Sequence, residues 1–362
     1  MLNKIASIVG VRPNFVKLVA LHKPLSNNFE HIIIHTGQHY DYELSKAFFD
    51  CFKLSDPDYN LNVGSGTYGY QVAEMIKRIE RVLLKEKPDM VIVYGDANST
   101  LAGALAAIMT HTKIAHVEAG YRSYDKSMPE EVNRILTDEM SDLLFAPTKT
   151  ALQNLKKENV QGRMFLTGDI MIDVLLNYLH FADEKANILE KLGLSPKDYV
   201  VITFHRQKNT ENRDRAARII KALLSLKEFK FVFPIHPRTR VALQKFGLYE
   251  KIMKSKNIKV IPPLNYLDFI SLEKNALKIV TDSGGVQKES YVLGIPCITL
   301  RDTTECIETV QEGWNILVGS DTERIIDAVR IFNPKSSSPR HALGKGDAAI
   351  KIIKVIENEF DV

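Results

Sequence analysis

The chain has 362 residues, a formal net charge of +4 and average shares of hydrophobic and charged residues. This length predicts about two domains, each with its own core. The mild, evenly mixed charge argues against nucleic acid and suits an anionic small molecule. Three widely spaced cysteines form neither a zinc pattern nor a disulfide framework, which fits a reducing cytoplasm. The apolar part of the first ten residues is too short for a signal peptide. No apolar run reaches the roughly 20 residues of a membrane span.

Strand-like apolar segments alternate with helix-like amphipathic segments along the whole chain. In the first half, strands are expected at 5–10, 31–37, 90–96, 113–120, 143–148 and 164–169, with helices such as 70–87 and 99–110 between them. In the second half, strands are expected at 199–205, 230–237, 258–263, 277–282, 295–301 and 314–319. Such alternation predicts parallel sheets covered by helices on both faces, and twelve strands fit two sheets better than one.

A polar stretch at 191–199, "KLGLSPKDY", follows a long helical pattern and predicts the border between the two domains. We therefore expect an α/β protein with two doubly wound, Rossmann-like domains at 1–172 and 195–335. A final amphipathic helix at 345–362 is expected to pack back on the first domain.

In nearly every expected strand, a polar residue that could take part in chemistry stands at the carboxyl end. These residues are Arg12, His35, Asp96, Glu118, His205, His236 and Asp282. Ligands of open α/β sheets bind at that edge, and two such sheets facing each other would form a deep cleft. The pattern therefore predicts a ligand-binding enzyme.

The segment "GVRPNFVK" follows the first strand and opens a helix. Arg12 and Lys17 could hold a diphosphate, Arg12 through its planar fork and Lys17 as a point charge. They could equally be surface residues that cap a turn. The segment lacks the G-x-G-x-x-G pattern, which disfavours a nicotinamide cofactor.

Three carboxylates in the first half are candidates for acid–base chemistry. Asp96 ends an apolar strand and would be partly desolvated, although it could also cap the next helix. Glu118 ends another apolar strand and has no obvious capping role. Glu130 opens a helix after Pro129, and its simpler role is a salt bridge to Arg134. Together they could supply the two opposed groups that proton transfer on both faces of a carbon requires.

The second half offers two histidines and an anion-binding turn. His205 and His236 end strands and could bind phosphate or polarise an oxygen, though each could be purely structural. In "TDSGGVQKES", glycines lie between a buried strand and a helix, where free N–H groups attract a phosphate. A well-capped turn without a ligand is the alternative. Glu289 lies one helical turn further on and could accept two ribose hydroxyls, and Arg301 follows the next strand.

The segments "TGQHYD", "VYGDANSTLAGALAA", "AHVEAGYRS", "MPEEVNRILTD", "HPRT" and "TDSGGVQKE" through "GIPCITLRDTTE" occur in this order. With them the chain resembles the non-hydrolysing UDP-N-acetylglucosamine 2-epimerases over nearly its whole length. The resemblance implies two Rossmann-like domains of the GT-B type and interconversion of UDP-GlcNAc and UDP-ManNAc. It implies elimination and re-addition of UDP through a 2-acetamidoglucal, with no redox cofactor and no metal.

The resemblance also implies roles for individual residues. The catalytic candidates are Asp96, Glu118, Glu130 and His205. The UDP-binding candidates are Arg12, Lys17, His236, Phe269, Ser283, Gly284, Gly285 and Glu289. The sugar-binding candidates are Arg134, Lys208, Arg301 and Asp302.

Three segments depart from the usual family pattern. The family has Gly-Thr-Arg-Pro-Glu, His-Arg-x-Glu-Asn and Glu-Arg-Pro-Glu where this chain has "GVRPN", "HRQKN" and "ECIE". The sequences of several motifs resemble those of a sister group, whose members epimerise UDP-2,3-diacetamido-2,3-dideoxyglucuronate. Lys208, in place of a Glu, would suit the carboxylate of that sugar.

Two other classes share the expected UDP cleft. A GT-B glycosyltransferase or a hydrolysing epimerase is one, although a transferase needs only one base in the first domain. A UDP-sugar sensor is the other, and it would have no use for Asp96, Glu118 and Glu130. We expect a cytoplasmic homodimer that supplies surface polysaccharide precursors, with no nucleic acid or membrane partner.

Overall fold

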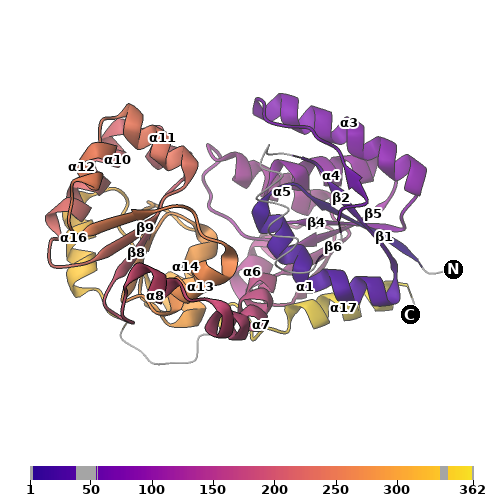
Figure 1. Ribbon diagram of the computed structural model, residues 1–362. Coiled ribbons are helices and arrows are strands. Elements are labelled where there is room, and N and C mark those ends of the chain that lie inside the picture. Colours follow the sequence, from indigo (N-terminus) through magenta and orange to yellow (C-terminus); the bar gives the residue numbers. More distant parts are fainter. Residues whose placement is uncertain (1–2, 38–53, 55, 335–340, 361–362) are drawn as a thin grey trace. The chain divides into compact units, whose positions relative to one another are not determined.

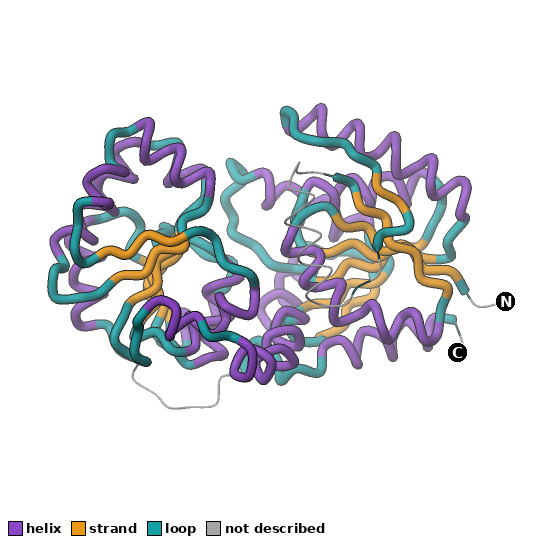
Figure 2. The backbone as a smooth tube through the Cα atoms, viewed as in Figure 1, coloured by secondary structure: helices purple, strands orange, loops and turns teal. Residues whose placement is uncertain are grey.

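The computed structural model describes residues 3–37, 54, 56–334 and 341–360 (Figure 1). Its contacts divide the chain into two compact units: unit 1, Met1–Val174 with Ala342–Val362, and unit 2, Leu175–His341. Each unit has a parallel sheet between helices (Figure 2). Part of the "TGQHYD" motif, residues 38–41, and Cys51 lie outside the described residues.

Unit 1 contains a seven-stranded sheet in the order β3-β2-β1-β4-β5-β6-β7, and every neighbouring pair is parallel. Its strands are β1 Lys4–Val9, β2 Glu30–His35, β3 Tyr59–Asn60, β4 Met90–Tyr94, β5 Lys113–Val117, β6 Leu143–Ala146 and β7 Arg163–Leu166. Strand β4 is buried along its whole length. A continuous apolar run of this kind is typical of a parallel strand that is covered on both faces.

Helices cover both faces of this sheet. They are α1 Arg12–Asn28, α3 Tyr68–Glu86, α4 Asn98–Met109, α5 Pro129–Met140, α6 Lys149–Lys157, α17 Ala348–Glu359 and the first residues of α7, whose full range is Ile170–Lys185. Helix α3 buries Val72, Met75, Ile79 and Val82, which recur at helical spacing. They pack with α4 over one face of the sheet, while α1 and α17 lie on the other face (Figure 1).

The C-terminal helix α17 is held within unit 1 by contacts at both of its ends. Asp173 accepts hydrogen bonds from the backbone N–H groups of Ala348 and Ala349 at 3.2 and 2.7 Å. At the other end, Asn28 donates to Glu357 at 2.6 Å. Burial raises the pKa of Asp173, although the two N–H donors oppose that rise.

Unit 2 contains a six-stranded sheet in the order β10-β9-β8-β11-β12-β13, again with parallel neighbours. Its strands are β8 Val200–Thr203, β9 Phe231–Pro234, β10 Ile258–Ile261, β11 Lys278–Thr281, β12 Cys297–Thr299 and β13 Asn315–Leu317. Its helices are α8 Ile188–Leu192, α9 Gln207–Thr210, α10 Arg213–Ser225, α11 Pro237–Lys245, α12 Tyr249–Met253, α13 Tyr266–Lys274, α14 Gly284–Leu293, α15 Ile307–Gln311 and α16 Thr322–Ile331.

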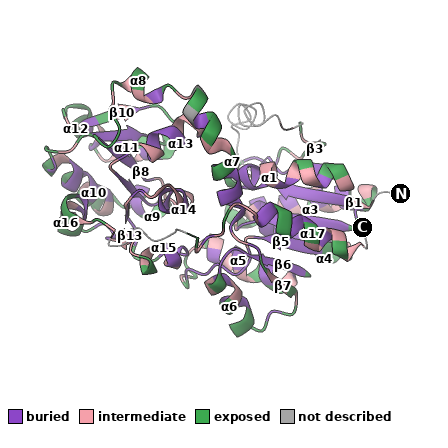
Figure 3. Cartoon of the chain, turned by 90° about the horizontal axis from the view of Figure 1, so that it is seen from below, coloured by how far each residue is buried: buried purple, intermediate pink, exposed green. Residues whose placement is uncertain are grey.

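Two hydrophobic clusters form the core of unit 2, one on each face of its sheet. One joins the strands to α10, α11, α12 and α16, and the other joins them to α8, α13 and α14. The central strands of both sheets, such as β1, β4, β9 and β11, are almost fully buried (Figure 3). Two doubly wound parallel sheets therefore confirm the predicted fold class.

All twelve predicted strands are present, and the described residues contain one more, the two-residue edge strand β3. Strand β3 is too short to show an alternating pattern in the sequence. The stretch 191–199, expected at the domain border, runs from the last residues of α8 to the residue before β8, inside unit 2. The units divide instead within α7, after Val174.

Each sheet has one place where the strand order reverses. It lies between β1 and β4 in unit 1 and between β8 and β11 in unit 2. Loops that follow these strands turn to opposite faces of the sheet and leave a crevice, where doubly wound proteins bind ligands. These two switch points are therefore the places to look for function.

Candidate functional site

At the switch point of unit 1, the turn after β1 leads into α1 at Arg12, and the turn after β4 leads into α4 at Asn98. Gly95, in the second turn, has a φ of +65°. A Cβ at Gly95 would lie 2.4 Å from the Nζ atom of Lys17. Only glycine allows both the left-handed backbone and this close approach of the ammonium.

Lys17 and Glu118 form a nearly buried ion pair. The Lys17 Nζ and Glu118 Oε2 atoms are 2.7 Å apart, and the side chains are only 6% and 12% exposed. Taking both charges out of water is costly, so a pair of this kind needs a close and well-oriented contact. Lys17 was predicted to bind phosphate; in this structure its ammonium faces a predicted catalytic carboxylate.

Glu118 has an unusual backbone conformation. Its φ is +78°, in the left-handed region that residues other than glycine rarely adopt. Its N–H donates to the carbonyl of Phe145 at 3.2 Å, at the end of the neighbouring strand. Strained residues of this kind cluster at functional sites, where the surrounding structure holds them in place.

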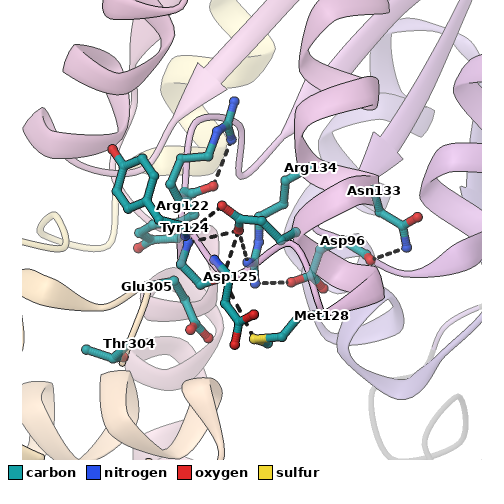
Figure 4. A network of polar contacts seen from close by, with 12 residues as sticks. Asp96, Arg122, Tyr124, Asp125, Met128, Asn133, Arg134, Thr304 and Glu305 are labelled. Atoms are coloured by element: carbon teal, nitrogen blue, oxygen red, sulfur yellow. Dashed lines mark hydrogen bonds and ion pairs between the residues drawn. The ribbon is translucent and has the colours of Figure 1, made fainter. Parts of the chain in front are cut away.

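Arg134 holds Asp96 at the end of β4. Its guanidinium donates to Asp96 Oδ2 and, at 2.9 Å, to Glu131 Oε2 (Figure 4). Arg134 is 4% exposed, whereas the Asp96 side chain is 31% exposed. Asp96 is therefore partly withdrawn from water, as expected, and Arg134 supplies a counter-charge.

The neighbouring acids Glu130 and Glu131 differ in their surroundings. Glu131 is buried and accepts hydrogen bonds from Ser123 N and Tyr124 N, both at 2.8 Å. Burial alone would raise the pKa of Glu131, but these N–H groups and Arg134 outweigh it and lower the pKa. Glu131 thus anchors the loop before α5, a structural role that the sequence pattern does not distinguish from that of Glu130.

Glu130 is half-buried near Tyr68. Burial, and then the charge of Glu130, raises the pKa of Tyr68. The Tyr68 hydroxyl donates to Asn133 Oδ1 at 2.6 Å, and Asn133 donates to the carbonyl of Asp96 at 2.8 Å. Through Asn133, the helix that carries Glu130 is joined to the turn that carries Asp96.

A fully buried network lies beneath these carboxylates, and the sequence analysis missed it. His116 donates from Nε2 to the carbonyl of Gly95 at 2.8 Å, and its Nδ1 lies 2.7 Å from Asp138. Asp138 also accepts from Gly120 N at 3.1 Å and pairs with Arg122 at 2.7 Å. These bonds join the turns after β4 and β5 to α5. In the sequence, the only sign of this network is a polar residue, His116, inside a largely apolar strand.

At the switch point of unit 2, the buried carboxylate of Asp282 collects N–H groups. It accepts from the backbone N–H groups of His205 and Arg206, both at 3.0 Å, and from Asn209 Nδ2 at 3.0 Å. Asp282 was expected only to end a strand at the ligand edge. Its contacts show that it shapes the loop carrying His205.

The two predicted histidines lie together in unit 2. The rings of His205 and His236 have centroids 5.3 Å apart, and the His205 side chain is 40% exposed. His205 Nδ1 is 3.8 Å from Asp282. His236 caps α11, because its Nδ1 accepts from Arg238 N at 3.1 Å. This cap occupies one ring nitrogen of His236.

Helix α14 begins directly after Ser283, its N-cap, with Gly284 and Gly285 in its first turn. The Ser283 side chain makes no cap hydrogen bond. A Cβ at Gly284 would lie 2.4 Å from the carboxylate of Glu305, whereas one at Gly285 would meet nothing closer than 3.9 Å. The Glu305 side chain would therefore have to move for a larger residue at position 284, whereas Gly285 leaves open space at the helix N-terminus. Glu289 is buried one turn further along α14.

The predicted sugar-binding residues of unit 2 lie in two ion-pair groups. Arg301 pairs with Glu305 at 2.7 Å. Asp302 pairs with Lys208 at 3.1 Å and with Arg215 at 3.3 Å. Burial opposes the effect, but these two cations lower the pKa of Asp302. The Lys208 side chain is 60% exposed, so this pair is open to water.

The other predicted contact in unit 2, Phe269 on α13, packs against the hydrophobic core of that unit. Arg12 is the first residue of α1, and its side chain lies outside the described part of the structure. Among the described residues, no group of three or more His, Cys, Asp or Glu side chains is placed to hold a metal ion. No helix in the described part of the chain is long and apolar enough to cross a membrane.

Ion-paired carboxylates at one switch point and a glycine-led helix N-terminus at the other are features of doubly wound α/β enzymes, in which helix N-termini commonly receive anionic ligands. Comparison with known proteins narrows this class. The chain belongs to the UDP-N-acetylglucosamine 2-epimerase family, whose model matches residues 23–357. The predicted family, an isomerase family, is thereby confirmed.

Relatives match along nearly the full length of the chain. A UDP-N-acetylglucosamine 2-epimerase homolog of Methanococcus maripaludis is 52% identical, over 98% of this chain and 99% of the relative. A UDP-2,3-diacetamido-2,3-dideoxy-D-glucuronate 2-epimerase of Pseudomonas aeruginosa is 41% identical, over 98% of this chain and 99% of the relative. The crystal structure of Methanocaldococcus jannaschii UDP-GlcNAc 2-epimerase in complex with UDP-GlcNAc and UDP is 43% identical, with a TM-score of 0.91 over 98% of this chain and 99% of that one.

Proposed function

We propose that this protein inverts C2 of a UDP-N-acetylhexosamine, converting UDP-GlcNAc to UDP-ManNAc, by elimination and re-addition of UDP. The buried Lys17–Glu118 pair, with Glu118 at a φ of +78°, is the observation that carries the proposal. A strained carboxylate held beside a cation at a sheet switch point has no evident role in packing, and it suits proton transfer.

The reaction balances without an oxidant or reductant. A carboxylate takes the proton from C2, and the electron pair of that C–H bond forms the C1–C2 double bond. The C1–O bond breaks, and its electron pair leaves with UDP. In the return step, the UDP oxygen adds to C1 while a second acid delivers a proton to C2 from the other face. Two opposed acid–base groups are therefore needed.

Asp96, Glu118 and Glu130 are the proposed acid–base groups of unit 1. Arg134 and Lys17 place cations beside Asp96 and Glu118, respectively. Glu131 is excluded from this role by its three hydrogen bonds to the loop at 123–124.

Unit 2 is proposed to hold UDP. Backbone N–H groups at Ser283–Gly285 would receive the diphosphate, and Glu289 would receive the ribose hydroxyls. His205, partly exposed above Asp282, would stabilise the charge that develops on departing UDP. Arg12 and His236 are the further phosphate candidates, and Arg301 is a candidate for the sugar.

A second substrate, UDP-2,3-diacetamido-2,3-dideoxyglucuronate, is supported by one feature. Lys208 places an ammonium where the family usually has a Glu, and a cation would pair with the carboxylate of that sugar. Its contact with Asp302 at 3.1 Å weakens this argument, because the ammonium already has a carboxylate partner. UDP-GlcNAc therefore remains the first candidate.

The test is NMR of the purified protein with each UDP-sugar in D₂O, without added NAD or metal. We expect the epimer to form and the C2 position to take up deuterium. Retention of the C2 proton during turnover would overturn the elimination mechanism. Stoichiometric release of free UDP would instead identify a hydrolysing enzyme, and dependence on an acceptor would identify a transferase.

We also propose that the enzyme is a cytoplasmic homodimer that supplies surface polysaccharide precursors. The sequence has no disulfide framework, which supports a reducing compartment. Cys297 and Cys306 are buried, and burial raises the pKa of Cys297 to about 11. Light scattering on the purified protein tests the dimer. A molar mass equal to that of one chain would contradict it.

A further inference from the structure

Asn14 stands where the family usually has a Glu, in the departing segment "GVRPN", and the proposed mechanism gives it no role. Its side chain is buried at 2% exposure in the first turn of α1. The amide Oδ1 accepts from Gly10 N at 3.2 Å, Val11 N at 3.3 Å and Ser99 Oγ at 3.2 Å. The Nδ2 donates to the carbonyl of Tyr94 at 2.7 Å.

These bonds join three segments that meet at the switch point of unit 1. Gly10 and Val11 form the turn after β1, Tyr94 ends β4, and Ser99 lies in the first turn of α4. The bonds to Gly10 and Val11 satisfy N–H groups near the start of α1, as the second half of a capping box does. The bond to Tyr94 is different, because it requires a donor.

An aspartate, which has the same length as Asn14, cannot keep all four of these bonds. An ionised Asp accepts hydrogen bonds only, so it could receive the N–H groups of Gly10 and Val11 but would face the Tyr94 carbonyl with like partial charge. Buried polar groups that lose their partners bear a large free-energy cost. The Asn side chain therefore fixes how closely α1 approaches the end of β4.

Packing around this contact leaves little room for adjustment. A Cβ at Gly10 would lie 2.4 Å from Thr36 Oγ1 and 2.6 Å from Ser99 Cβ. Lys17, one turn beyond Asn14 on α1, must reach both Gly95 and Glu118 from this position. A shift of the first turn of α1 toward or away from the end of β4 therefore moves the Lys17 ammonium relative to Glu118.

We infer that Asn14 is a positioning residue for the reaction: its amide ties α1 to the end of β4 and so places Lys17 against Glu118. The kinetic part of this inference rests on the proposed epimerase function. The structural part, the dependence of the Lys17–Glu118 contact on Asn14, does not.

The substitution Asn14→Asp keeps the size and the acceptors and removes the donor. Asn28→Asp is the matched control, because Asn28 lies in the last turn of the same helix and also donates from Nδ2 to an acceptor oxygen, that of Glu357, at 2.6 Å. We expect Asn14→Asp to lower kcat about 10- to 100-fold with KM changed less than about 3-fold, as a displaced catalytic group does. Asn28→Asp should leave kcat within about 2-fold even if it lowers Tm equally. Equal kcat values for the two variants would overturn the inference.

A double-mutant cycle tests whether Asn14 acts through Lys17. In a Lys17→Met background, Asn14→Asp should cause little further loss of kcat, because residues that act as a unit are not additive. Full additivity would overturn the proposed route through Lys17.

A crystal structure of the Asn14→Asp protein gives a readout that needs no activity. We expect the Lys17 Nζ to leave hydrogen-bond distance of Glu118. An unchanged contact would overturn the inference even if the enzyme is active. If the wild-type protein epimerises neither UDP-sugar, the proposed function fails, and this structural comparison still decides the role of Asn14.

Discussion

Units 1 and 2 have the same strand order at their switch points but place different groups there. In unit 1, charged side chains meet in pairs, Lys17 with Glu118 and Arg134 with Asp96. In unit 2, the buried Asp282 gathers the N–H groups of the following loop, and a helix begins with glycines. This difference supports the proposal that the residues of unit 1 transfer protons and those of unit 2 bind UDP.

The largest effect is expected from Glu118→Gln in unit 1. Loss of an acid–base group should lower kcat about 10³-fold, while UDP affinity by calorimetry stays unchanged, because unit 2 is proposed to hold UDP. Glu139→Gln, an exposed residue of α5, is the control and should match the wild type. A weakened UDP affinity in Glu118→Gln would break the division between the units.

The complementary change is Glu289→Ala in unit 2. Loss of a ligand for hydroxyl groups should weaken UDP binding by about 1–3 kcal/mol, whereas kcat at saturating substrate should change little. Glu323→Ala, at an exposed position of α16, is the control. Calorimetry showing wild-type UDP affinity for Glu289→Ala would contradict its assignment to the nucleotide.

Acid stability should also differ between the units. His31 in unit 1 contacts Ser7 at 2.8 Å, and burial lowers its pKa to about 3 from the ordinary 6.5. The folded state therefore binds fewer protons than the unfolded state between these values. Stability is fully present above pH 6.5 and falls below it, by about 1–2 kcal/mol at pH 5.

The single tryptophan, Trp314, separates the two units in this measurement. It lies in unit 2, so its fluorescence reports unfolding of unit 2 while circular dichroism reports both units. From pH 7 to pH 5 we expect the dichroism midpoint in denaturant to fall, and His31→Gln to reduce that fall. An equal fall in the variant would show that another group causes the acid sensitivity.

The smallest effect is expected at Lys208, which bears on the choice of sugar. The Lys208 side chain is 60% exposed and already pairs with Asp302. Lys208→Glu should therefore weaken binding of the transition state of a carboxylate-bearing substrate by only about 1 kcal/mol. If Lys208 binds a sugar carboxylate, the substitution should lower kcat/KM for the diacetamido uronate about 5-fold and change kcat/KM for UDP-GlcNAc little. Lys227→Glu is a surface control. Equal changes for both substrates would favour UDP-GlcNAc as the substrate.

Much of the fold and part of the site could be predicted from local patterns. Apolar runs such as "MVIVY" and the helical spacing of α3 identified the elements, and Asp96, Glu118, His205 and Asp282 were placed correctly at strand ends. The residues that were missed, His116 and Asp138, act inside the core. A lone polar residue in a buried strand is visible in the sequence, but its partner is not.

The alternation of strands and helices could be read from local patterns, because periodicity and turn residues act over a few neighbours. The same patterns show which polar residues follow each strand. The pairs that these residues form depend on the folded structure: Lys17 with Glu118, Asn14 with the Tyr94 carbonyl, and Glu131 with its loop. Hydrogen bonds and ion pairs depend on distances of a few tenths of an ångström between segments far apart in the chain, and packing of the two doubly wound sheets sets those distances.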